Sequence, residues 1–122
     1  MADRLLIILA NTDPRDPVAL GSPFNQATSA AAMEYDVEVV LTGRTGELAM
    51  KGVAAQIEVR KDLGRTVYDL IKEAHEAGVR FKACVPVDQA ANGALIPEVE
   101  DTVGGAYIIS EAMDEDTVTL TY

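Results

Sequence analysis

The chain has 122 residues, and its 20 acidic side chains outnumber its 10 lysines and arginines to give a net charge of −10. This length suits one domain spanning residues 1–122. The charge disfavours nucleic acid and anionic membrane surfaces, because binding to either needs a basic surface. Hydrophobic residues make up 48% of the sequence and charged residues 25%, a balance typical of a packed globular protein rather than a disordered one.

The sequence contains one cysteine, Cys84, and one histidine, His75. These numbers exclude an internal disulfide and a zinc site of the Cys/His kind. An apolar run at residues 5–10 is too short for a signal peptide or a membrane span. We therefore expect a cytoplasmic protein with a reduced thiol, no metal and no cofactor.

Short apolar runs alternate with helical patterns in the first third of the chain. Residues 4–10, which are apolar from Leu5 onward, predict a strand buried on both faces. Ser22 and Pro23 have the character of a helix N-cap and first helical residue, so we expect an alanine-rich helix from there to about residue 35. Residues 37–42 predict a second strand.

The next segment is less regular. Residues 43–46, Gly-Arg-Thr-Gly, predict a turn, and they lack the spacing and the lysine of a phosphate-binding P-loop. Residues 47–55 favour a short helix that Gly52 weakens. Residues 56–63 fit either a loop or a short edge strand.

The clearest helix signal covers residues 66–77. Thr66 and Asp69 have the spacing of a capping box, and Gly78 is a typical C-terminal stop. Residues 79–85 then predict a strand whose alternation places Cys84 on the opposite face from its apolar residues.

The last third of the chain completes an α/β pattern. Residues 86–97 predict a loop, 98–103 a short strand, 105–113 a helix and 117–122 a final strand. Strands that alternate with helices favour a mostly parallel sheet covered on both faces. The sequence therefore predicts a three-layer α/β/α sandwich with four or five strands.

Polar residues follow several of these strands. Because sites in open parallel sheets collect at the carboxyl ends of the strands, we expect Cys84 to lie where a site would form. The candidate substrate-binding residues at this edge are Asn11, Thr12, Arg44, Asp88 and Gln89. The acidic run at residues 111–116 has no EF-hand spacing and favours a solvated surface.

The single thiol limits the chemistry. A thiolate can accept a sulfane sulfur as a persulfide and pass it to another thiol by exchange. A thioredoxin-like oxidoreductase needs a second cysteine, and a cysteine protease needs a nearby histidine, whereas His75 falls in the middle of a predicted helix. The alternative is that Cys84 is a buried, unreactive apolar side chain, as free cysteines often are.

Taken together, the order of these segments resembles the DsrE/DsrF-like family, which includes the sulfur-relay subunits TusD and DsrE. The resemblance rests on the strand at residues 5–11 and the helix opening at 22–24, on residues 36–43, on residues 71–79 leading into the strand that ends with Cys84, and on residues 95–100. It implies an α/β/α domain that assembles into trimers or hexamers. It also implies that Cys84 holds sulfur as a persulfide and exchanges it with donor and acceptor proteins.

Two hypotheses of different class remain open. The first is a sulfur carrier, or sulfurtransferase, whose nucleophile is Cys84. The second is a non-catalytic assembly subunit or small-ligand-binding module of the same fold. An exposed strand edge and small helical side chains favour self-association under either hypothesis. The acidic surface is expected to favour basic partner proteins.

Overall fold

The centre of the protein is a five-stranded sheet in the order β6-β5-β2-β1-β7, in which every neighbouring pair is parallel. We describe it from a computed structural model, which covers residues 2–86 and 94–122. The strands of this sheet are β1 (Arg4–Leu9), β2 (Asp36–Thr42), β5 (Arg80–Cys84), β6 (Val99–Thr102) and β7 (Thr117–Thr121).

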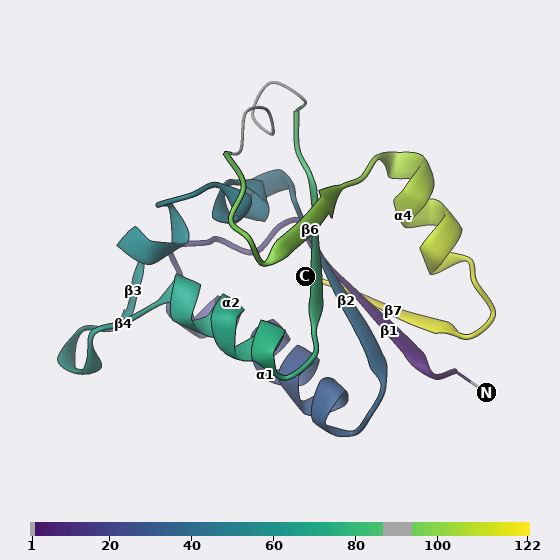
Figure 1. Cartoon of the computed structure of the whole chain (residues 1–122), viewed down its shortest axis with the longest axis horizontal. Coiled ribbons are helices and arrows are strands. Elements are labelled where there is room, and N and C mark those ends of the chain that lie inside the picture. The colour runs from purple at the N-terminus through teal and green to yellow at the C-terminus, as the bar shows by residue number, and fades with distance from the viewer. Residues whose placement is uncertain (1, 87–93) are drawn as a thin grey trace.

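Helices cover both faces of the sheet. The helices α1 (Pro17–Ala32) and α2 (Val67–Glu76) lie side by side on one face, while α4 (Gly105–Ala112) lies on the other (Figure 1). The predicted three-layer α/β/α sandwich is therefore confirmed. Its sheet has five strands, the larger of the two numbers predicted.

The main core lies between the sheet and the α1–α2 layer. Alternate residues of the strands point into it, so Val39 of β2 and Phe81 of β5 are fully buried there. Phe24 of α1 contacts Phe81, with ring centroids 6.1 Å apart. The predicted alternation of β5 is confirmed, because Phe81 and Ala83 belong to this core while Lys82 and Cys84 face the α4 layer.

Helix α1 begins earlier than predicted. Its N-cap is Asp16, whose carboxylate accepts hydrogen bonds from the backbone N–H groups of Val18 and Ala19 at 3.1 and 3.2 Å. Pro17 occupies the first helical position, so Asp16 and Pro17 are the start signal and Ser22 lies inside the helix. Pro23 is tolerated within the helix, where it is buried.

The segment between β2 and α2 also differs from the prediction. Instead of one α-helix it forms two 3₁₀ helices, η1 (Gly43–Ala49) and η2 (Ala54–Gln56), which Gly52, with a φ of +85°, helps to separate. The ambiguous residues that follow form a small antiparallel pair, β3 (Glu58–Arg60) and β4 (Arg65–Thr66), joined by the short 3₁₀ helix η3 (Lys61–Leu63).

The remaining predicted helices and strands are confirmed with small shifts in their ends, while most of the loop predicted at residues 86–97 lies outside the described residues. The capping box at α2 is present, since Asp69 accepts from the Thr66 backbone N–H at 2.9 Å and Thr66 caps the Asp69 N–H. Gly78 follows α2 with a φ of +110°, a conformation that favours glycine. Within residues 2–86 and 94–122, no helix is long and apolar enough to cross a membrane.

Candidate functional site

Cys84 is the last residue of β5 and lies half-buried at the carboxyl edge of the sheet. Its register partner on the neighbouring strand is Thr42, the last residue of β2. The Thr42 hydroxyl donates a hydrogen bond of 3.0 Å to the Cys84 carbonyl oxygen. This bond fixes the backbone that carries the thiol to the end of β2.

The end of β2 is in turn held against the end of β1. Gly43 has a φ of +53°, and a Cβ atom at this position would lie 2.6 Å from the Ala10 carbonyl oxygen. The next residue, Arg44, donates its backbone N–H to the same oxygen at 2.9 Å. The buried Thr45 hydroxyl accepts from the Thr42 N–H at 3.2 Å and also contacts the Leu9 carbonyl. These contacts hold the start of η1 against the end of β1, next to the strand end that pairs with Cys84.

The structure brings together two of the predicted substrate-binding residues. The Arg44 guanidinium donates to the Asn11 carbonyl oxygen at 3.3 Å and lies 3.7 Å from the Asp13 carboxylate. Asn11 is exposed, and Thr12 beside it is buried. The loop after β1 and the start of η1 thus form one wall of the carboxyl edge.

The other predictions for this edge concern Asp88, Gln89 and the turn at residues 43–46. Asp88 and Gln89 lie outside the described residues, so their placement stays a prediction. The turn predicted at residues 43–46 is the first part of η1, and its Arg44 N–H bonds to the Ala10 carbonyl oxygen. The helix η1 also approaches the residue that follows Cys84, because a Cβ on Gly46 would lie 3.0 Å from a methyl group of Val85.

The only histidine lies away from the thiol. His75 is exposed near the C-terminal end of α2, which leads into the beginning of β5, whereas Cys84 is at the end of that strand. His75 is therefore not placed to act as a base for Cys84. In the part of the chain that the structure describes, no group of three or more His, Cys, Asp or Glu residues is arranged to hold a metal ion.

A buried ionic cluster beneath Cys84 was not identified from the sequence. Lys82 lies two residues before Cys84 on the same face, and its ammonium group is 3.2 Å from the Glu38 carboxylate. The Tyr107 hydroxyl of α4 accepts from Lys82 at 2.9 Å and donates to Glu38 at 2.7 Å. The sequence signal is an acid within the apolar run of β2, since such a residue needs a partner when buried.

The pKa values in this cluster are those of a charged lysine beside a neutral tyrosine. Burial by itself lowers the pKa of Lys82, but its bonds to Tyr107 and Glu38 outweigh burial, and the pKa is raised above its ordinary value. Burial, aided by Glu38, raises the pKa of the Tyr107 hydroxyl against the opposite effect of Lys82. The Lys82 charge is therefore balanced by Glu38.

Comparison with known protein families gives a match. The chain matches the sequence profile of the DsrE/DsrF-like family over residues 5–121. It belongs to the DsrE/DsrF-like family. The family is associated with sulfur relay, and the match spans all five strands of the main sheet except the first residue of β1. The resemblance inferred from the sequence is therefore confirmed.

A solved structure shows that this DsrE/DsrF-like chain shares its fold with a distant protein. The protein of unknown function MTH1491 from Methanobacterium thermoautotrophicum is similar over 100% of both chains, with a TM-score of 0.61 and 16% sequence identity. At this identity the likeness concerns the fold alone. The chain has no match among curated proteins.

Proposed function

We propose that this DsrE/DsrF-like protein is a sulfur carrier that holds sulfane sulfur as a persulfide on Cys84. The observation that carries the proposal is the placement of the single cysteine, half-buried, at the carboxyl end of a parallel strand. Family membership adds support, because the family is associated with sulfur relay.

The proposed reaction requires no external oxidant. The Cys84 thiolate attacks the outer sulfur of a donor persulfide, R–S–SH; a new S–S bond forms, the donor S–S bond breaks, and the donor leaves as a thiolate. An acceptor thiolate then attacks the outer sulfur on Cys84 and releases the Cys84 thiolate. Each step exchanges one S–S bond for another, so one cysteine is sufficient when donor and acceptor are separate molecules.

The residues around the edge suggest how a donor is received. Arg44 is exposed and presents a cation on the wall formed with Asn11, so it can attract an anionic sulfur group. Thr42 holds the backbone of Cys84 and limits the positions that the thiol samples. We further propose that donor and acceptor are proteins with basic surfaces, because the chain carries a net charge of −10.

The proposal is tested by intact-mass measurement after incubation with a persulfide donor. We expect the mass to increase by one sulfur atom, the increase to disappear on reduction, and the Cys84→Ser variant to show no increase. Transfer to an acceptor thiol would then restore the original mass. Alkylation by iodoacetamide before the incubation should block the increase, which locates the sulfur on the thiol.

The same experiment separates the carrier from a non-catalytic assembly subunit. A folded protein that gains no sulfur from persulfide or thiosulfate donors, and whose Cys84 reacts with thiol reagents only after unfolding, would overturn the carrier proposal. Far-ultraviolet circular dichroism of the same samples checks that the protein stays folded.

A further inference from the structure

The strand β7 forms one edge of the sheet, and its outer side is unpaired within the described residues. The Arg4 N–H bonds to the Asp116 carbonyl at 3.1 Å, and the Tyr122 N–H bonds to the Ile8 carbonyl at 2.9 Å. Backbone groups of the even-numbered residues therefore face β1. Because backbone direction alternates along a strand, the N–H and C=O groups of Thr117, Thr119 and Thr121 point outward.

The two edges of the sheet differ in their protection. The edge strand β6 carries exposed acidic residues at positions 100 and 101, and its pairing with β5 shifts register. Charges and irregular pairing are features that prevent edge-to-edge association. Residues 117–121 of β7, Thr-Val-Thr-Leu-Thr, contain no charge and no proline, and their pairing with β1 is regular. Of the two edge strands, β7 is therefore the one that lacks protection against pairing with another strand.

Two side chains of β7 also lack partners. The hydroxyl oxygens of Thr117 and Thr119 are buried without a hydrogen-bond partner, and they are the only such side-chain atoms among the described residues. Buried polar groups are normally satisfied, so these two require an explanation. Both hydroxyls lie on the α4 side of the strand, beside its open edge.

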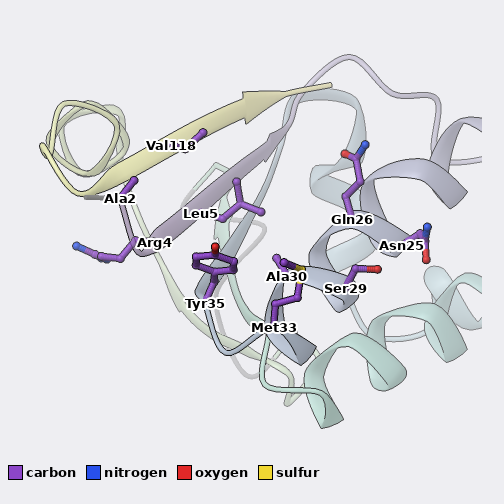
Figure 2. A pocket seen from close by; sticks show the side chains of 10 residues that line it. All are labelled: Ala2, Arg4, Leu5, Asn25, Gln26, Ser29, Ala30, Met33, Tyr35 and Val118. Carbon is purple, nitrogen blue, oxygen red and sulfur yellow. The ribbon is translucent and has the colours of Figure 1, made fainter.

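An apolar groove borders the same edge on the α1 side. It has a volume of about 390 Å³; its floor contains Leu5 and Val118, and Met33 and Tyr35 lie beside them (Figure 2). Val118 is 48% exposed and Met33 is 65% exposed, so the groove is an open apolar surface. None of its ten lining residues is acidic, in a chain with 20 carboxylates.

We propose that β7 pairs antiparallel with β7 of a second copy of this chain, about a two-fold axis at Thr119. The strand sequence is self-complementary in this register: Thr119 faces its own copy, Thr117 faces Thr121, and Val118 faces Leu120. The outward backbone groups become paired, and the Thr119 hydroxyls come within reach of each other. The groove has no acidic lining residue and includes Arg4, so two acidic molecules meet less repulsion at this face than at a carboxylate-rich one.

This pairing is independent of Cys84 and places the two α1 layers on the same side of one continuous sheet. The exposed Val118 side chain of each copy then contacts the Leu120 side chain of the other. Because each molecule carries a net charge of −10, added salt is expected to strengthen the association. A second copy is the occupant because the strand is self-complementary, with threonine facing threonine and Val118 facing Leu120.

Sedimentation-velocity ultracentrifugation over a range of protein concentrations tests the proposal. We expect the wild type to contain a two-fold pair, and Val118→Lys to weaken its association by about tenfold or more. Leu63→Lys is the matched control, because Leu63 is 62% exposed and lies in η3. A wild type that is monomeric at all concentrations would overturn the proposal, as would a small apolar molecule found bound to such a monomer by native mass spectrometry.

Cross-linking tests the register without depending on the lysine variant. In the Cys84→Ser background, Val118→Cys combined with Leu120→Cys places facing cysteines in a non-hydrogen-bonded pair with Cα atoms about 4.5 Å apart. Mild oxidation should give a covalent dimer, whereas Val118→Cys alone should not. An assembly that forms without this cross-link, or one with an odd number of subunits and no two-fold pair, would contradict the proposed strand pairing.

Discussion

The Tyr107 hydroxyl donates a hydrogen bond of 2.7 Å to the Glu38 carboxylate, and this bond ties α4 to the centre of the sheet. Glu38 is 3% exposed, and its carboxylate contacts Tyr107, Lys82 and the more distant Arg80. Helix α4 itself has no fully buried residue. Its position is therefore set largely by polar contacts, which include the ion pair of Arg4 with Glu111 at 2.9 Å.

Replacing Tyr107 by phenylalanine should destabilise the protein. The substitution keeps the ring but removes one of the hydrogen bonds to the buried Glu38 carboxylate, a loss of about 1.5–3 kcal/mol for a bond to a charged group. Urea unfolding followed by circular dichroism measures the change. Tyr35→Phe is the control, because Tyr35 is 44% exposed and lies away from the Glu38 cluster. Equal stability of both variants would show that the bond to Glu38 contributes little.

The same cluster predicts a loss of stability at alkaline pH. The pKa values of Lys82 and Tyr107 are both raised in the folded protein, from ordinary values of 10.5 and 10.0. A group with a raised pKa binds its proton more tightly when folded, so its contribution is complete below the unfolded pKa and is lost as the pH rises through the folded pKa. The free energy of unfolding should therefore fall above about pH 10. The fall should be smaller in Tyr107→Phe, and an identical pH profile for the two proteins would contradict this assignment.

Substitution of Gly43 tests the support behind the candidate site. Gly43→Ala would place a Cβ 2.6 Å from the Ala10 carbonyl oxygen in a left-handed conformation, so we expect a loss of about 2–4 kcal/mol. Gly52→Ala is the matched control: Gly52 also has a positive φ, but a Cβ there meets nothing within 4 Å. Its expected loss is about 1 kcal/mol. Thermal unfolding measures both variants, and a similar loss for both would mean that the contact with Ala10 relaxes freely.

The role of Arg44 is tested by the charge of the thiol reagent. If its guanidinium attracts anions to Cys84, Arg44→Gln should slow the reaction of Cys84 with the dianionic reagent 5,5′-dithiobis(2-nitrobenzoic acid). In water, a unit charge about 8 Å from another contributes about 0.5 kcal/mol, roughly twofold in rate, so we expect an effect of this order at most. The reaction with neutral iodoacetamide should not change. Arg15→Gln is the control, because Arg15 pairs with Glu47 on the same loop wall. Equal slowing by both variants would assign the effect to the overall charge.

Local signals explain which elements the sequence predicts well. The strand leading to Cys84 and helix α2 were found because alternation, the Thr66 capping box and Gly78 all act within a few residues. The predicted start of α1 at Ser22 was wrong because the sequence contains two pairs that resemble a helix start, Asp16-Pro17 and Ser22-Pro23. Asp16 accepts the first N–H groups of the helix, and Pro23 is buried inside it. The helix expected at residues 47–55 is instead split between η1 and η2, and glycines with positive φ lie at the start of η1 and between the two.

The sequence by itself determined the α/β class, the family and the place of its one cysteine at a strand end, because these depend on periodicity and on order along the chain. Only the tertiary structure decided that Glu38 meets Lys82 and Tyr107, which are 44 and 69 residues away, and that the neutral strand β7 lies at an open edge. Both follow from the order of the strands. That order depends on how the whole sheet packs against its helices, and no local pattern encodes it.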